Sequence, residues 1–130
     1  MNTPRYINPL TDFGFKHYLL GNVHLELQQL IENVVYFELL RRRCQVTTGK
    51  VVDKEVDFRV KDINGTTVYI QVAVTVASEE KLAQELEPFK MIDDNYAKYI
   101  LTLDEVFVRD HDGVKTIGLI DFLLGKEPIV

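Results

Sequence analysis

The sequence has a single cysteine, Cys44, and no hydrophobic run that approaches the roughly 20 residues of a membrane-spanning helix. One cysteine cannot form a disulfide within the chain, and no other cysteine completes a zinc site. The first residues, MNTPRYINPLTDFGF, contain no apolar segment of the kind found in a secretory signal. These absences predict a cytoplasmic protein without a membrane partner.

Positive charge is also scarce. Lysine and arginine number 15 against 20 aspartate and glutamate residues, so the net charge is −5. This balance excludes a protein that coats nucleic acid by electrostatics alone. Basic residues do gather at Arg41, Arg42 and Arg43. At the end of a helix they are expected to complement the helix dipole and stay solvated, and the alternative is a phosphate contact.

The length of 130 residues predicts one folded domain over residues 1–130. Residues 1–22 hold two prolines and two glycines among aromatic residues, which predicts an ordered N-terminal arm. Residues 24–43 form one predicted helix, because their apolar residues recur at spacings of three and four. These apolar residues are Leu27, Leu30, Ile31, Val34, Val35 and Leu39.

After this helix the hydrophobic period changes from 3.6 to 2, which predicts strands over 45–52, 54–61 and 66–76. Asn64-Gly65 predicts the hairpin turn between the second and third of them. Ser78 caps a second helix, which Pro88 kinks or ends early, and a fourth strand follows over 97–103. A crossover helix allows this strand to run parallel to the third.

A turn at 110–113, a short strand at 114–117 and a helical turn at 120–124 complete the chain. The predicted fold is α/β, with an αβββαβ core. Its mixed sheet has four to five strands and is flanked by helices.

Strand alternation places Asp57 on the face opposite Val56 and Phe58, and it places Gln71 and Ala73 together on one face. A hydrolytic Mg²⁺ site needs hard oxygen ligands that converge from neighbouring strands and a helix. A lysine two residues after the second acid would point to the same side and offset the charge of the transition state. Asp57, Gln71, Ala73 and the helical Glu32 occupy these places.

This pattern resembles the PD-(D/E)XK nuclease superfamily, whose core is restriction-endonuclease-like. Residues 31–127 also resemble the C-terminal domain of a family of prokaryotic AAA+-type ATPases, through IENVVYFELLRR, KEVDF, VYIQVAVT, DNYAKYILTLDE and IDFLLGKE. Residues 5–21, RYINPLTDFGFKHYLLG, resemble the opening of the PD-(D/E)XK transposase-type nucleases. The sequence contains no GxxxxGK[ST] motif, so the ATPase domain that usually precedes this module is absent from it.

The resemblance implies a role for each matching residue. Asp57 matches the first aspartate of the motif, Gln71 falls at the second acid, and Ala73 falls at the lysine. Glu32 falls at the helical acid, and Glu38 is the second choice for it. The implied catalytic and metal-binding set is therefore Glu32, Asp57 and Gln71. An amide is a neutral, weaker ligand than a carboxylate, so Mg²⁺ binding is expected to be weak or absent.

Three functions follow from this set. The first is a degenerate nuclease-fold domain with a binding or regulatory role, whose partner is nucleic acid, an ATPase or another protein. The second is an active Mg²⁺-dependent DNA nuclease that uses Asp57 and Glu32, with Lys81 or Lys98 replacing the missing lysine. The third is a plain interaction domain, such as a homodimer. Each residue also has a structural interpretation, with Gln71 bonded to a neighbour and Ala73 a packing residue.

Overall fold

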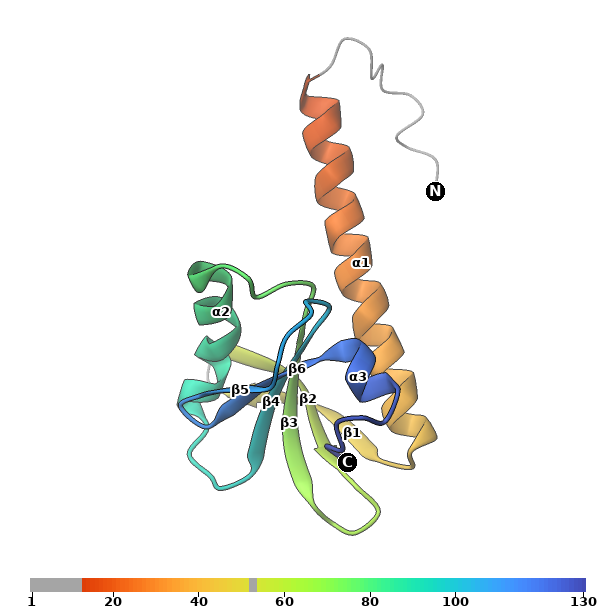
Figure 1. Cartoon of the computed structure of the whole chain (residues 1–130), viewed down its shortest axis with the longest axis vertical. Helices are drawn as coiled ribbons and strands as arrows, with labels where there is room; N and C mark the ends of the chain where they lie inside the picture. The colour runs from red at the N-terminus through yellow and green to blue at the C-terminus, as the bar shows by residue number, and fades with distance from the viewer. Residues whose placement is uncertain (1–12, 52–53) are drawn as a thin grey trace.

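The computed structural model describes residues 13–51 and 54–130, and it describes side chains over 22–47 and 56–130. The chain is a mixed α/β protein built on one six-stranded sheet (Figure 1). Its elements in chain order are α1 (Phe13–Arg41), β1 (Gln45–Val51), β2 (Lys54–Lys61), β3 (Thr67–Ala73), α2 (Glu79–Leu86), the 3-10 helix η2 (Glu87–Met91), β4 (Ala97–Thr102), β5 (Arg109–His111), β6 (Val114–Gly118) and α3 (Leu119–Leu123).

The strands lie in the order β1-β2-β3-β4-β6-β5. β1, β2 and β3 form an antiparallel meander, and β4 pairs parallel to β3 after the α2 crossover, as predicted. β6 extends the parallel part, and β5 closes that edge as an antiparallel strand. The sheet therefore has six strands, more than the four to five predicted. The strand that was missed is β5, which at three residues is too short to show an alternating pattern.

Helices cover both faces of the sheet (Figure 1). On one face, α1 and α3 bury Ile31, Val35, Leu39 and Phe122 against side chains of β2, β3 and β4. On the other, η2 buries Phe89 against Val56, Ile100 and Val114, and α2 adds Leu82 and Leu86 at the margin. All seven residues of β3 are buried, because this strand lies at the centre of the sheet.

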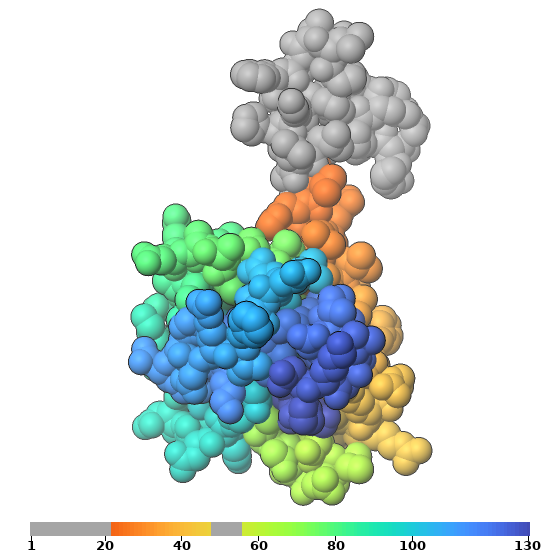
Figure 2. Space-filling model, viewed as in Figure 1, coloured from red at the N-terminus to blue at the C-terminus, as the bar shows by residue number. Residues whose placement is uncertain are grey.

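Helix α1 is longer than the helix predicted over 24–43. It begins at Phe13, ends at Arg41 and contains 29 residues. Of the predicted N-terminal arm, residues 1–12 lie outside the described part of the chain, and residues 13–22 belong to α1. A glycine in the interior of a helix costs about 1 kcal/mol relative to alanine, and α1 nevertheless continues through Gly21. Its N-terminal part projects beyond the sheet (Figure 1). In Figure 2 the orange residues that follow the grey ones stand above the body of the molecule.

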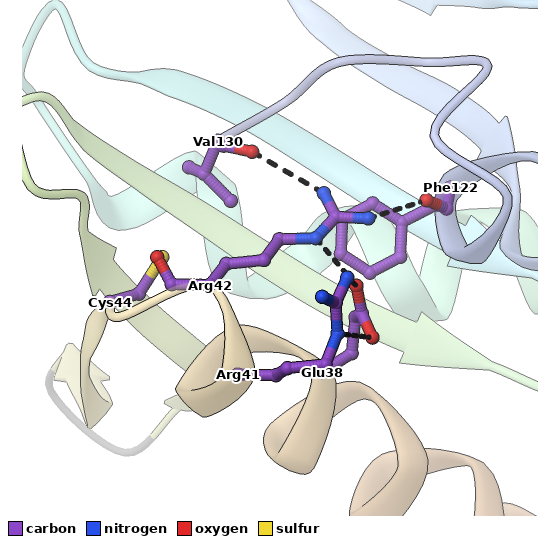
Figure 3. Close-up of polar contacts among 6 residues, drawn as sticks. All are labelled: Glu38, Arg41, Arg42, Cys44, Phe122 and Val130. Atoms are coloured by element: carbon purple, nitrogen blue, oxygen red, sulfur yellow. Dashed lines mark hydrogen bonds and ion pairs between the residues drawn. The ribbon is translucent and has the colours of Figure 1, made fainter.

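The C-terminal end of α1 is tied to the end of the chain by Arg42 (Figure 3). The Arg42 guanidinium donates hydrogen bonds to the backbone oxygens of Phe122, at 2.8 Å, and Val130, at 3.3 Å. It also lies 4.3 Å from the centre of the Phe122 ring. The Arg42 side chain is only 16% exposed, whereas that of Arg41 is 70% exposed. The expectation that all three arginines stay solvated is therefore wrong for Arg42.

None of the helices in the described part of the chain is long and apolar enough to span a membrane.

Candidate functional site

Asp57 and Gln71 lie opposite each other on β2 and β3, because Phe58 pairs with Ile70 in the antiparallel ladder. The backbone N–H of Asp57 donates to Oε1 of Gln71 at 2.8 Å. The carboxylate of Asp57 in turn accepts a hydrogen bond at Oδ2 from the N–H of Val72, also at 2.8 Å. Each residue thus uses its side chain to bond the backbone of the neighbouring strand.

These side-chain hydrogen bonds take the place of backbone hydrogen bonds where the pairing of β2 with β3 ends. The backbone pairing of β2 with β3 ends at Phe58 and Ile70. Beyond that point, the buried end of β3 still needs partners for its polar backbone groups. Asp57 satisfies the N–H of Val72. Gln28 of α1 satisfies the next two groups, since it donates from Nε2 to the Val72 oxygen at 2.8 Å and accepts at Oε1 from the N–H of Val74 at 3.1 Å.

Glu32 joins this network through Gln28. Oε2 of Glu32 accepts the second Nε2–H of Gln28 at 2.7 Å, one helical turn along α1. Glu38, the second choice for the helical acid, lies in a different cluster. It accepts hydrogen bonds from Arg41 and Arg42 near the C-terminal end of α1 (Figure 3). Of the two glutamates, Glu32 is the one connected to the Asp57–Gln71 pair.

Glu85 of α2 is a member of the site that sequence reasoning missed. Burial raises the pKa of its carboxyl group, the Gln71 side chain and Lys81 partly offset this shift, and Glu32 adds to it. Glu85 is therefore close enough to interact with residues of β3, α2 and α1. The signal that could have identified it is a lysine and a glutamate at positions i and i+4, flanking the apolar residues Leu82 and Leu86 of the helix.

Ala73, which the sequence resemblance aligns with the lysine of the nuclease motif, is a buried packing residue. Ala73 is 3% exposed at the end of β3. Of the two lysines suggested as replacements, Lys98 lies at the start of β4, opposite Tyr69. Its Nζ donates to the backbone oxygen of Tyr96, at 2.9 Å, and to Asp94. The other, Lys81, lies on α2, and its positive charge lowers the pKa of the Glu85 carboxyl group.

The predicted ligand set does not fit a two-carboxylate Mg²⁺ site in this arrangement. The amide oxygen of Gln71 already accepts the Asp57 N–H, and one oxygen each of Asp57 and Glu32 accepts an N–H from Val72 or Gln28. Over the residues that the structure describes, no three aspartate, glutamate, histidine or cysteine side chains form a metal-binding group. The oxygens serve as hydrogen-bond acceptors that hold β2, β3 and α1 together.

No protein-family model matches the chain. A Haemophilus influenzae (strain Rd) protein described only as uncharacterized is 30% identical to it over 115 residues, which is 88% of this chain. The chain spans only 28% of the length of that protein, so it is similar to one segment of a longer polypeptide. No solved structure matches the chain.

Proposed function

We propose that this chain is a PD-(D/E)XK-like domain that binds nucleic acid, or a partner such as an ATPase, without cleaving a phosphodiester. The element order α1-β1-β2-β3-α2-β4, with a meander followed by a parallel crossover strand, is the arrangement that such a domain requires. The observation that carries the proposal is the hydrogen bond from the Asp57 N–H to Oε1 of Gln71. Through this bond Gln71, at the second acid position of the motif, links β3 to β2.

The chemistry of the motif positions supports this proposal. A catalytic site of this class uses two carboxylates to hold the metal and a lysine to offset negative charge in the transition state. Here the second carboxylate is the neutral Gln71, and the lysine position is the buried Ala73. Loss of one transition-state contact costs about 10²–10³ in rate. Loss of that contact together with a ligand charge leaves a domain suited to binding.

The test compares cleavage and binding in the same protein. We expect no cleavage of single- or double-stranded DNA above background in Mg²⁺ or Mn²⁺. We also expect Asp57→Asn to leave nucleic-acid binding, measured by fluorescence anisotropy, unchanged. The asparagine oxygen can still accept the Val72 N–H, so the fold is preserved. Asp93→Asn, at an exposed loop position, is the matched control. Cleavage by the wild type that Asp57→Asn abolishes and Asp93→Asn retains would refute the proposal.

The interaction of Glu85 with Gln71 favours a second candidate function, an active Mg²⁺-dependent nuclease. In that case Glu85 supplies the missing carboxylate and Lys81 the missing positive charge, both from α2, while Asp57 keeps its place. Cleavage lost in each of Glu85→Gln, Lys81→Met and Asp57→Asn would establish this candidate. A matched control is Lys90→Met, because Lys90 is an exposed lysine of η2 that pairs only with Glu87 among the residues the structure describes.

A further inference from the structure

Helix α1 carries a stripe of exposed apolar residues that takes no part in the core. Leu30 is 57% exposed and Phe37 is 64% exposed, and Val23 and Val34 are exposed as well. Together these four side chains expose on the order of 400 Å² of apolar surface. A standard protein–protein interface buries about 800 Å² on each partner, of which a little more than half is apolar. The stripe alone therefore supplies about the apolar area that a stable dimer needs.

The stripe borders a groove between α1 and α3, which lies beside the C-terminal half of α1 (Figure 1). The groove has a volume of about 530 Å³, and its apolar lining is Leu30, Val34, Phe37 and Leu123. Its polar lining is Asn33, Glu38 and Arg41. The charge of Glu38 is already compensated, because its carboxylate accepts hydrogen bonds from Arg41 and Arg42. The groove thus presents an apolar surface without an uncompensated acid.

The spacing of the stripe is typical of a helix that packs against another helix. Steps of four and three residues alternate along Val23, Leu27, Leu30, Val34, Phe37 and Arg41. This is the heptad repeat by which a helix meets a second helix along a seam. Leu27 is partly buried against the core, and the other five are exposed. The series of steps is the same in both directions, so two antiparallel copies of α1 would place Leu30 of each opposite Val34 of the other.

The charges at the two ends of the stripe match an antiparallel second copy. Glu26 is exposed one helical turn before Leu30, and Arg41 is exposed at the C-terminal end. An antiparallel copy brings each Glu26 toward the Arg41 of the other, whereas a parallel copy brings like charges together. Arg41 can bond Glu38 and this second carboxylate at once, because a guanidinium has five N–H donors. Asn33 lies near the midpoint, where two amides can donate to and accept from each other.

The shape of the molecule favours the same arrangement. The N-terminal part of α1 projects beyond the sheet (Figure 1). The sheet of an antiparallel copy lies beside this projecting part, whereas the two sheets of a parallel pair would lie at the same end. We propose that this face of α1, with Leu123 of α3, binds a second copy of the chain, antiparallel about a two-fold axis near Asn33. None of the stripe residues belongs to the Asp57–Gln71 network, so the dimer is independent of the function proposed above.

Sedimentation velocity of the full chain over about 1–100 µM tests the proposal. We expect the mass to rise with concentration from 15.0 kDa toward twice that value. Leu30→Gln and Phe37→Gln should each weaken the dimer about tenfold or more, because each removes an apolar side chain from the centre of the interface. Leu25→Gln is the matched control and should leave the dimer unchanged. Leu25 is an equally apolar, exposed residue of α1, but it lies about 140° around the helix from Leu30.

Circular dichroism shows whether each variant is folded, which is expected because all three positions are exposed. A folded wild type that stays monomeric over the whole range would overturn the proposal, even if a different protein covers this face. A dimer that both Leu30→Gln and Phe37→Gln leave intact would overturn it too, because the copies would then meet through another surface.

A charge exchange tests the antiparallel arrangement. At low salt, Glu26→Lys and Arg41→Glu should each weaken the dimer about threefold or more, because each creates two pairs of like charges. An equimolar mixture of the two variants should dimerise about as tightly as the wild type, because each new lysine then faces a new glutamate. Glu105→Lys, at an exposed position outside the stripe, changes the net charge equally and should have no effect. Single variants that dimerise as tightly as the wild type would contradict the antiparallel arrangement.

Discussion

Gln28 and Val72 are 44 residues apart in the chain and are joined by a 2.8 Å hydrogen bond from the Gln28 side chain to the Val72 backbone oxygen. The same amide accepts a hydrogen bond from the N–H of Val74. The Gln28 side chain thus makes the two backbone hydrogen bonds that a neighbouring strand would otherwise make at the end of β3. This contact joins α1 to the end of β3. Glu32 of α1 lies near the same strand end, because its carboxylate accepts a hydrogen bond from the Gln28 amide. The position of the candidate site therefore depends on a glutamine that the nuclease motif does not include.

The first prediction concerns this glutamine. Gln28→Ala should lower the free energy of unfolding by about 1–3 kcal/mol, because it leaves the Val72 oxygen, at the end of the central strand β3, and the Val74 N–H, just after that strand, without their side-chain partner. Gln29→Ala, at the exposed neighbouring position, is the control and should change stability by less than about 0.5 kcal/mol. Urea unfolding of both variants measures the difference. Equal stability of the two variants would show that the Gln28 bonds do not hold β3.

The second prediction concerns restoration of the nuclease motif. Gln71→Glu with Ala73→Lys rebuilds the acid and the lysine, but the new carboxylate would face Glu85. Adding Glu85→Gln removes that repulsion. We expect the triple variant to cleave DNA in Mg²⁺ and to lose this activity on Asp57→Asn.

Stability must be measured alongside activity, because Ala73 is buried and a lysine there places a charge in the core. Thermal unfolding of the triple variant, followed by circular dichroism, shows whether it is folded. A triple variant that is folded and inactive would contradict the assignment of these positions to a nuclease motif.

The third prediction concerns the charge of Glu85. Burial raises the pKa of this carboxyl group in the folded state, so the folded protein binds its proton more tightly than the unfolded chain does. The ionised form is therefore destabilising above the folded pKa, and stability increases as the pH falls toward the unfolded value. Glu85→Gln should raise the stability at pH 7, by less than about 1 kcal/mol. It should also flatten the change in stability across the weakly acidic range. Lower stability of Glu85→Gln at pH 7 would contradict this reading.

Much of the fold follows from local patterns. The alternation around Asp57 and the Asn64-Gly65 turn were sufficient to predict that Asp57 and Gln71 lie on adjacent strands. Gln28 and Glu85 could not be assigned in the same way, because their partners depend on where two helices meet the sheet. Arg42 shows the same limit. Three adjacent arginines look equivalent in the sequence, but α1 ends at Arg41, and Arg42 and Arg43 lie in the turn that follows, with Arg43 at a positive φ of 62°. The turn sends their side chains in different directions, and the Arg42 guanidinium lies over the Phe122 ring.

The last prediction concerns Glu38, which joins Arg41 and Arg42 at the end of α1 (Figure 3). Hydrogen bonds from Arg41 and then Arg42 lower the pKa of the Glu38 carboxyl group to about 2. A depressed pKa means that the stabilisation is present above the unfolded value and is lost as the pH falls through the folded value. The contribution of Glu38 should therefore decline between about pH 4.5 and pH 2.

Substitutions should separate the two arginines that bond Glu38. Arg42→Gln should lower the free energy of unfolding by about 2–3 kcal/mol at pH 7, because it removes bonds from a largely buried guanidinium to Glu38, Phe122 and Val130. Arg41→Gln should cost less than about 1 kcal/mol, because that side chain is 70% exposed and its ion pair is screened. Urea unfolding at pH 7 and pH 2.5 measures both effects. Similar costs for the two substitutions, or a cost of Glu38→Gln that does not shrink at pH 2.5, would show that Arg42 is not the residue through which this cluster stabilises the fold.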